Sequence, residues 1–248
     1  MTSHHVLQSA RSGLGFLTTL PVGFSAEGLE SLASHMWIYV FVGAAIGVIV
    51  GGINDALASA PNMNGLLRAA LTLVALYALT GFIHLDGLAD IGDGLLKHGT
   101  TQERLRVIKE PYVGVGGVSF CILAFLLLFS AVTSIKSAII PAFITAEVAA
   151  KLSMVQVASF GKATHKGLGS LFSEKSGPFT FVVALLLALI ISTLCFGLKG
   201  IVALLPPVAL SFGLLKLANM AFGGINGDVI GASNELGRLT ALIAISLL

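Results

Sequence analysis

Charged residues are scarce in this chain: only 10% of its 248 residues are Asp, Glu, Lys or Arg, against about 25% in a typical soluble domain. That shortage excludes an ordinary soluble domain and is typical of a polytopic membrane protein. The net charge of +2 is too small to indicate a nucleic-acid partner. The two cysteines both lie inside apolar runs, which argues against a disulfide framework. The first residues have no apolar core and no cleavage site, so we expect no signal peptide.

Hydrophobic residues make up 56% of the chain and fall into long runs separated by polar loops. A run of about 20 apolar residues is long enough to cross a bilayer as a helix. The runs predict an all-α, polytopic integral membrane protein of about seven spans with a single domain, residues 1–248. Residues 1–36 contain only a short apolar stretch, so we expect an N-terminal interfacial or re-entrant segment there. The predicted spans cover residues 37–57, 66–83, 113–132, 138–160, 178–198 and 201–220, and a last one that must begin near residue 228 to be long enough.

The lysines and arginines are divided unequally between the two sides of these spans. Cytoplasmic loops of membrane proteins carry an excess of both residues. We therefore predict a cell-membrane protein whose N-terminus and longer loops are cytoplasmic. The same alternation brings three polar segments to that side, residues 84–112, 161–177 and 223–237. The predicted cytoplasmic side receives Arg11, Lys97, Arg104, Arg106, Lys109, Lys162, Lys166, Lys175, Lys216 and Arg238, and the other side receives Arg68, Lys136 and Lys199.

Residues 86–93 hold three carboxylates directly after an apolar run. On a helix, steps of four and three residues put Asp86, Asp90 and Asp93 on one face. Each close pair of like charges costs on the order of 3 kcal/mol at an effective dielectric of about 20. A divalent cation would relieve that repulsion, and carboxylates favour Mg²⁺, with Mn²⁺ as the alternative. We therefore interpret this face as a metal site.

The neighbours of the aspartates favour a phosphorylated substrate. Mg²⁺ usually binds one or two carboxylates and takes further ligands from substrate phosphates. Glycines of the segment, including Gly87 and Gly94, would let a bulky phosphate group approach the backbone, and basic residues would contact its oxygens. The pattern predicts metal-assisted phosphoryl transfer at the membrane surface. An intramembrane ion pathway and a solvated loop without chemistry fit the same residues. The basic residues are Lys97, Lys109, Lys162 and Lys166.

Five other polar residues have both a functional and a structural interpretation. Asp228 and Glu235 share a helix face, yet Asp228 follows a glycine and would equally serve as a helix N-cap. Lys151 lies four residues after Glu147 inside a predicted span, where the two would neutralise each other. His84 is on a different face from the aspartates, and is either a hydrogen-bond donor to a metal ligand or an interfacial histidine.

Five segments, in this order and spacing, resemble one enzyme family along essentially the whole chain. The aspartate segment is His84-Leu85-Asp86-Gly87-Leu88-Ala89-Asp90-Ile91-Gly92-Asp93-Gly94-Leu95. The other four are Gly15-Phe16-Leu17-Thr18-Thr19-Leu20-Pro21-Val22, residues 105–110 followed by Gly114-Val115-Gly116-Gly117-Val118, Gly167-Leu168-Gly169, and residues 223–232. The family that they resemble is cobalamin synthase, or adenosylcobinamide-GDP ribazoletransferase.

The resemblance implies an Mg²⁺-dependent integral membrane enzyme of vitamin B12 biosynthesis. Its substrates would be adenosylcobinamide-GDP and α-ribazole or α-ribazole 5′-phosphate. The products would be adenosylcobalamin or its 5′-phosphate, and GMP. A hydroxyl would attack a phosphoryl group while metal ions neutralise the pyrophosphate, which agrees with the chemistry expected from the aspartates. The resemblance leaves open whether the enzyme forms a homo-oligomer.

Residue by residue, the resemblance implies metal binding by Asp86, Asp90 and Asp93, with Asp228 as a fourth catalytic acid. Either Asp93 or Asp228 would accept the hydroxyl proton. One departure is Glu110-Pro111-Tyr112, which stands where Asp-Ser-Arg is usual, so that Lys109 or Lys166 would replace the missing arginine. The residues expected to contact substrate or phosphate are His84, Gly87, Gly94, Lys97, Lys109, Lys151, Lys166 and Asn226.

Two other functions compete with this interpretation. A CDP-alcohol phosphotransferase would share the beginning of its Asp-x-x-Asp-Gly pattern with residues 90–94, but the downstream Gly-x-x-x-Asp-x-x-x-Asp is absent after Gly94. A cation transporter would spread its acids at mid-membrane depth over several helices. In this chain most acids lie near one predicted membrane face, and only Glu147 is deep.

Overall fold

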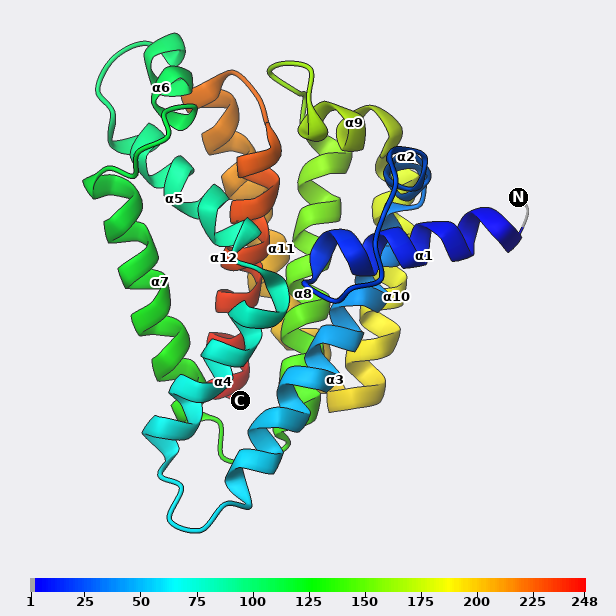
Figure 1. Cartoon of the computed structure of the whole chain (residues 1–248), viewed down its shortest axis with the longest axis vertical. Coiled ribbons are helices and arrows are strands. Elements are labelled where there is room, and N and C mark those ends of the chain that lie inside the picture. The colour runs from blue at the N-terminus through cyan, green and yellow to red at the C-terminus, as the bar shows by residue number, and fades with distance from the viewer. Residues whose placement is uncertain (1–2) are drawn as a thin grey trace.

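The computed structural model describes residues 3–248, with side chains from residue 5 onward, and it confirms the predicted all-α fold (Figure 1). Met1 and Thr2, the beginning of the predicted N-terminal segment, lie outside the described residues. Within them there are twelve α-helices, a short 3-10 helix η1 and an isolated β-bridge. The helices are α1 Ser3–Leu17, α2 Ala26–Ser34, η1 Met36–Ile38, α3 Tyr39–Ala58, α4 Gly65–Thr80, α5 Ile83–Leu96, α6 Thr101–Ile108, α7 Val115–Ser134, α8 Ile139–Phe160, α9 Leu168–Lys175, α10 Pro178–Phe196, α11 Leu198–Phe222 and α12 Gly227–Ser246.

Five helical segments are long and apolar enough to cross a membrane, and six if α4 and α5 count as one bent span. They are η1 with α3, α7, α8, α10 and α11, and each overlaps a predicted span. The predicted number of about seven is therefore approximate. Two predicted spans account for the difference. The α4 helix has only 16 residues, and α12, which begins at Gly227 as its length required, carries Asp228, Glu235 and Arg238.

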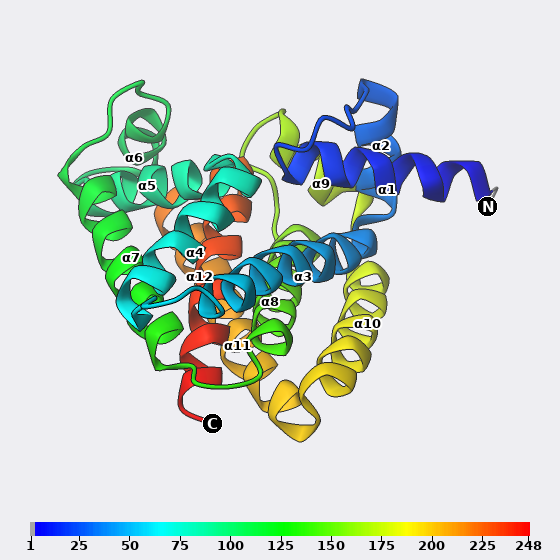
Figure 2. The same cartoon turned by 60° about the horizontal axis from the view of Figure 1, so that its bottom comes forward.

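Helices α8 and α12 form the centre of the bundle, with α3, α4, α7, α10 and α11 around them (Figure 2). In the apolar 18-residue stretch of α8, 78% of the residues are buried, whereas the corresponding stretch of the peripheral α10 has 22%. Glycines on α3 explain its close approach to α8. A Cβ atom at Gly47 would lie 2.5 Å from the Ile144 Cα, and one at Gly43 would lie 2.5 Å from the Glu147 carbonyl oxygen.

A buried network of charges joins the two central helices. The Arg238 side chain on α12 forms ion pairs with Glu147 on α8 and with Glu235, at 2.6 Å from the latter. Lys151 Nζ lies 3.6 Å from Glu147, which confirms the predicted pair, and donates a hydrogen bond to Asn234 at 2.6 Å. Because two acids face two cations, the network is neutral overall, as a charge cluster in an apolar bundle must be.

This network corrects two expectations. Lys151 is 0% exposed and is held by Glu147 and Asn234, so it is not placed to contact a substrate phosphate. Arg238 was counted with the predicted cytoplasmic loops, but it is fully buried within α12. The count of lysines and arginines on that side therefore falls from ten to nine, which leaves the bias intact.

The predicted second span ends early, at a sharp bend between α4 and α5. Gly81 and Phe82 both adopt left-handed backbone conformations, with φ of 69° and 61°. For a residue other than glycine this conformation costs about 1–2 kcal/mol, and the Phe82 ring stacks on Tyr77 with 5.4 Å between the ring centroids. Helix α5 leaves at 96° to α4. Since its 14 residues extend only about 21 Å, α5 is not a spanning segment but crosses one end of the bundle.

Candidate active site

The aspartate segment forms α5, whose apolar face packs into the bundle. Residues 84–112 form one of the polar segments of the predicted cytoplasmic side, but half of the residues of α5 are buried. Its buried residues lie between and beside the aspartates and are mostly small, so the same helix that carries three carboxylates can pack closely. They are His84, Gly87, Leu88, Ala89, Ile91, Gly92 and Gly94.

The glycines of α5 serve contacts between helices. A Cβ atom at Gly87 would lie 2.7 Å from the Asp228 carbonyl oxygen on α12, and one at Gly92 would lie 2.9 Å from the Gly116 carbonyl oxygen on α7. At Gly94 the nearest atoms belong to Ile108 and Phe222, both at 2.9 Å. Protein atoms thus occupy the space in which Gly87 and Gly94 were expected to admit a substrate phosphate. These two glycines instead fix the position of α5 against α6, α11 and α12.

Asp93 has a role that its spacing did not predict. Its two carboxylate oxygens accept hydrogen bonds from backbone amides at the start of α7, Oδ2 from Gly114 at 2.6 Å and Oδ1 from Gly117 at 2.9 Å. The first amides of a helix lack partners within the helix and carry partial positive charge. Asp93 therefore holds the beginning of α7 against α5, while Asp86 and Asp90 have no such partner among the described residues.

Asp228 joins the aspartates of α5 from the first turn of α12. The N-cap of α12 is not Asp228, as one interpretation had it, but Asn226, whose Oδ1 accepts the Val229 amide at 3.0 Å. The Nδ2 of Asn226 donates to Asp228 at 2.7 Å. Asn226, expected to contact substrate, is buried and occupied in capping the helix and orienting Asp228.

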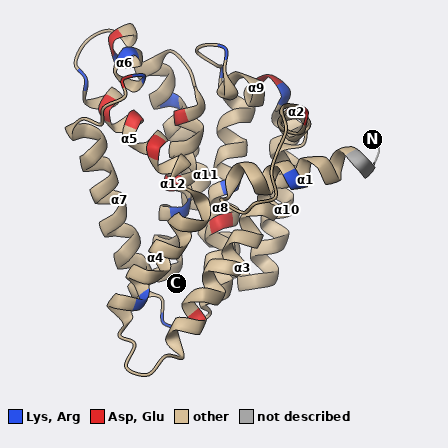
Figure 3. Cartoon of the chain, in the orientation of Figure 1, with Lys and Arg blue, Asp and Glu red and all other residues tan. Residues whose placement is uncertain are grey.

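The loop at residues 161–177 lies beside the same helix start, as predicted. The backbones of residues 163 and 225 form a parallel bridge, in which Ile225 donates to the Lys162 carbonyl at 2.8 Å and Thr164 donates to the Ile225 carbonyl at 2.9 Å. A Cβ at Gly169 would lie 2.7 Å from the Asn226 backbone. Figure 3 shows the resulting concentration of charge at the end of the bundle formed by α5, α6 and α9. All three predicted polar segments therefore converge there.

The four carboxylates repel one another. Burial, together with the charges of Asp228, Asp86 and Asp93, raises the pKa of Asp90 from its ordinary 3.8 to about 7. Burial and the charge of Asp86 also raise the pKa of Asp228. No salt bridge neutralises any of the four within residues 5–248. Lys97, Lys109 and Lys166 are exposed on the surrounding segments, so they remain available to an anionic ligand.

The fit of a metal follows from these positions. No group of three or more His, Cys, Asp and Glu side chains in the described part of the chain is arranged to hold a single ion. A complete protein cage for a metal is thus not preformed there. Mg²⁺, however, usually takes one or two carboxylates and completes its shell with water and substrate phosphates. Asp86 and Asp90, one helical turn apart and without cationic partners, fit that pattern.

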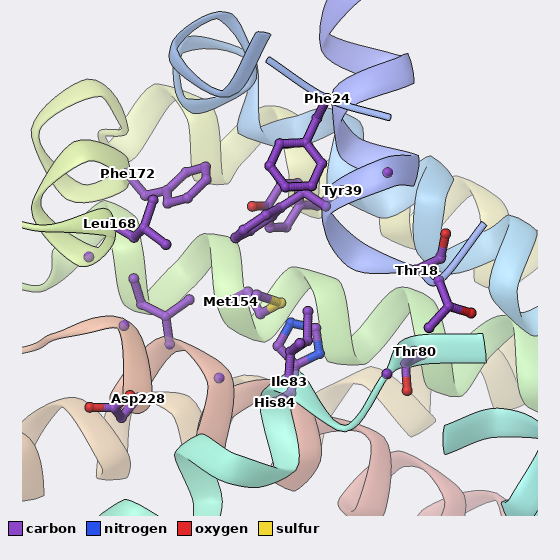
Figure 4. Close-up of a pocket in the computed structure, with 18 residues that line it drawn as sticks. Thr18, Phe24, Tyr39, Thr80, Ile83, His84, Met154, Leu168, Phe172 and Asp228 are labelled. Carbon is purple, nitrogen blue, oxygen red and sulfur yellow. The ribbon is translucent and has the colours of Figure 1, made fainter. Parts of the chain in front are cut away.

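A cavity of about 520 Å³ adjoins Asp228 and the first turn of α5 (Figure 4). His84 lines it, whereas the α5 carboxylates do not. Its aromatic walls come from Phe16, Phe24, Tyr39 and Phe172, none of which the sequence singled out as a site residue. Phe16 lies in the N-terminal segment that resembles a family motif, and Leu168, Gly169 and Gly227 of the lining lie in two further motif segments, so these motifs were the available signal. Tyr39 and Phe172 belong to stretches with no distinguishing pattern.

A helical membrane bundle with an acidic polar site at one end defines the class of the molecule, a polytopic membrane enzyme. Comparison with known proteins then identifies the family. The chain belongs to the cobalamin-5-phosphate synthase family, whose sequence model matches residues 9–246.

Relatives of the chain carry one enzyme name. An adenosylcobinamide-GDP ribazoletransferase of Methanosarcina barkeri is 36% identical over 98% of this chain and 92% of its own length. Proteins of the same name from Methanosarcina mazei and Geotalea daltonii are 36% and 35% identical, over 97% and 94% of this chain and 92% and 94% of their own lengths. No solved structure matches the chain. The predicted family is therefore confirmed.

Proposed function

We propose that this chain is an Mg²⁺-dependent adenosylcobinamide-GDP ribazoletransferase, which joins α-ribazole or its 5′-phosphate to adenosylcobinamide-GDP. The observation that carries the proposal is the meeting of α5 and α12, where carboxylates without cationic partners stand beside a cavity. The name and the extent of the relatives support the substrates. Burial raises the pKa of Asp90 and the charges of Asp228, Asp86 and Asp93 raise it further, and this repulsion supports a cation at the same place.

The reaction exchanges a phosphoanhydride bond for a phosphoester bond at the same phosphorus. The hydroxyl oxygen of α-ribazole forms a bond to the phosphorus that is linked to cobinamide, and the bond from that phosphorus to the oxygen of GMP breaks. The hydroxyl loses its proton, and GMP leaves with the bridging oxygen. Mg²⁺, when bound, would neutralise the pyrophosphate and polarise the phosphoryl group.

The residues divide these tasks. We assign Mg²⁺ binding to Asp86 and Asp90, and contacts with pyrophosphate oxygens to Lys97, Lys109 and Lys166. Asp228 lies at the cavity and its raised pKa favours proton transfer, so we assign it the hydroxyl proton. Asp93 was the other candidate for the proton and a candidate metal ligand. Because amides of α7 occupy both of its oxygens, we assign it to positioning.

We also propose that the site and the N-terminus face the cytoplasm in the cell membrane. The bias of nine to three in lysines and arginines supports this orientation. A cysteine introduced at Lys166 in a variant without Cys121 and Cys195 should react with a membrane-impermeant maleimide only after the cells are opened. Equal labelling of intact cells would reverse the orientation.

The test of the activity uses purified protein in lipid nanodiscs, supplied with adenosylcobinamide-GDP and α-ribazole. We expect corrinoid product and GMP with Mg²⁺ and neither with chelator. Asp90→Asn should lower kcat by about 100-fold or more without changing elution in size-exclusion chromatography. Asp55→Asn, an exposed acid near the far end of α3, is the matched control. Equal turnover in chelator would refute the metal, and consumption of a CDP-alcohol instead would refute the substrates.

A further inference from the structure

Four aromatic rings build one side of the cavity beside Asp228. The rings of Phe16 and Phe172 are nearly parallel, with centroids 5.8 Å apart and an interplanar angle of 29°. Tyr39 meets Phe172 edge-on at 5.9 Å, and Phe24 meets Phe16 edge-on at 5.8 Å. Figure 4 shows Phe24, Tyr39 and Phe172 together on this side. Such a wall favours a flat aromatic ligand, which can stack on it or meet ring edges.

The opposite side offers a polar group that has no partner in the protein. His84 is only 5% exposed and lines the cavity with Ile83 and Met154. Its ring nitrogens have no hydrogen-bond partner among the described residues, although buried polar groups are nearly always paired. Asp228 lies at one end. The cavity thus combines aromatic walls, one unsatisfied imidazole and a carboxylate at its end.

We propose that this cavity binds α-ribazole, with its bicyclic base between the aromatic wall and His84 and its ribose directed to Asp228. This inference rests on the proposed function and names the place of one of its two substrates. The volume of about 520 Å³ lies within the range of about 300–1,000 Å³ that is usual for small-molecule sites. A nucleoside fits such a volume, whereas the much larger corrin ring does not.

The character of the walls selects between the two aromatic bases of the reaction. Guanine needs several hydrogen-bond partners around its edge, and leaving them unpaired in a buried site is costly. The benzimidazole base of ribazole is mostly apolar and has a single free ring nitrogen as acceptor, which one His84 nitrogen can satisfy. Apart from Asp228 and His84, the polar side chains that line the cavity are Tyr39 and three threonines, Thr18, Thr19 and Thr80, whose hydroxyls already donate to backbone carbonyls.

The N-terminal segment gives the cavity its outer wall, which explains why that segment carries a family motif without any charged residue of the site. The Thr19 amide donates to the Leu79 carbonyl of α4 at 2.8 Å, and Arg11 Nε donates to the Val22 carbonyl at 2.8 Å. A Cβ at Gly15 would lie 2.7 Å from the Gly23 carbonyl oxygen. The segment is therefore fastened over the cavity and presents Phe16 and Phe24 to it.

The experiment measures the Kd of radiolabelled α-ribazole for the purified full-length protein by equilibrium dialysis, in the presence of chelator and without corrinoid. We expect saturable binding, because the cavity does not depend on the metal. Phe172→Leu should raise Kd about tenfold through loss of stacking. Phe143→Leu is the control, since Phe143 is equally buried but packs where α8 meets α3, outside the cavity.

A second cavity variant keeps the test valid if Phe172→Leu fails to fold. A Cβ at Gly227, which lines the cavity, meets no atom within 4 Å. Gly227→Leu should therefore be tolerated and should abolish binding by occupying the space. In the full assay, both cavity variants should raise KM for α-ribazole and leave KM for adenosylcobinamide-GDP unchanged.

Each outcome decides. Unchanged Kd in both cavity variants of an active enzyme overturns this inference and leaves the proposed function standing. A rise in KM for adenosylcobinamide-GDP alone gives the cavity to the other substrate, which also overturns it. If the wild type makes no corrinoid product, the proposed function fails. In that case the binding site would still be supported if the wild type binds α-ribazole and the cavity variants weaken this binding. If the wild type makes no product and also binds no α-ribazole, both proposals fail.

Discussion

A substitution at Asp93 tests whether the aspartates of α5 have different roles. Three aspartates on one helix face invite the same role, but only Asp93 has backbone amides on both oxygens, from Gly114 at 2.6 Å and Gly117 at 2.9 Å. We predict that Asp93→Ala separates α5 from the start of α7 and destabilises the fold. By contrast, Asp90→Ala removes a charge that its neighbours repel, and should leave the stability of the metal-free protein equal or greater.

The magnitude follows from the two hydrogen bonds. A hydrogen bond to a charged group contributes about 1.5–3 kcal/mol. The amide of Gly114 lies at the surface, where water replaces most of the lost bond, whereas the amide of Gly117 is partly buried and stays unsatisfied. We therefore expect a loss of about 2–4 kcal/mol for Asp93→Ala. For a chain of this length that corresponds to a fall in Tm of about 5–15 °C.

Thermal unfolding in detergent, followed by circular dichroism without added metal, measures this difference. Asp55→Ala is the control for loss of an exposed acid. The reasoning is refuted if Asp93→Ala melts with the wild type, or if Asp90→Ala loses as much stability as Asp93→Ala. A normal Tm with loss of all turnover in Asp93→Ala would return Asp93 to the reaction, as a metal ligand or as the acceptor of the proton.

Three further changes probe the helix packing. Arg238→Met should lower the free energy of unfolding by about 3–5 kcal/mol, because it leaves a net negative charge in the core. Adding Glu235→Gln should restore part of the lost Tm. If it restores none, the charge balance is not what stabilises the core. Gly92→Ala should lower Tm because its Cβ would lie 2.9 Å from a carbonyl oxygen of α7, while Gly213→Ala, with open space around it, should raise Tm slightly; equal effects would dismiss the contact. Tyr39→Phe should be neutral or stabilising by up to about 1 kcal/mol, because the buried hydroxyl has no partner among the described residues; a clear loss of Tm would mean that the hydroxyl is bonded.

The membrane helices could be predicted because bilayer thickness sets one dominant constraint. The predicted spans 113–132, 138–160 and 178–198 correspond to Val115–Ser134, Ile139–Phe160 and Pro178–Phe196. The bend at Gly81 and Phe82 escaped prediction. A left-handed phenylalanine has no sequence signature, and its strain is held by tertiary contacts such as the stacking on Tyr77.

The sequence predicted which acids belong to the candidate site, but not that they have different roles. The spacing of Asp86, Asp90 and Asp93 fixes their common face, and the topology brought Asp228 to the same end. What separates Asp93 from the others is a contact with amides 21 and 24 residues further along the chain. A pattern of spacing within one helix contains no information about such a partner. The aromatic side of the cavity was missed for the same reason, since its four rings come from α1, the loop after it, α3 and α9.

The buried charge network explains how Asp228 on α12 and the aspartates of α5 are held at fixed positions relative to each other. Asp228 belongs to α12, and α12 touches α5 at Gly87, where no side chain can intervene. Ten residues further along, about 15 Å down the helix, Arg238 pairs with Glu147 on α8, and Glu235 accepts the Tyr77 hydroxyl of α4 at 2.8 Å. Tyr77 in turn supports Phe82 at the bend from which α5 departs. One neutral polar network therefore fixes α12 directly and α5 through the bend. A loss of Arg238 should accordingly lower kcat more than its effect on Tm alone explains, because Asp228 and Asp90 would no longer be held in register.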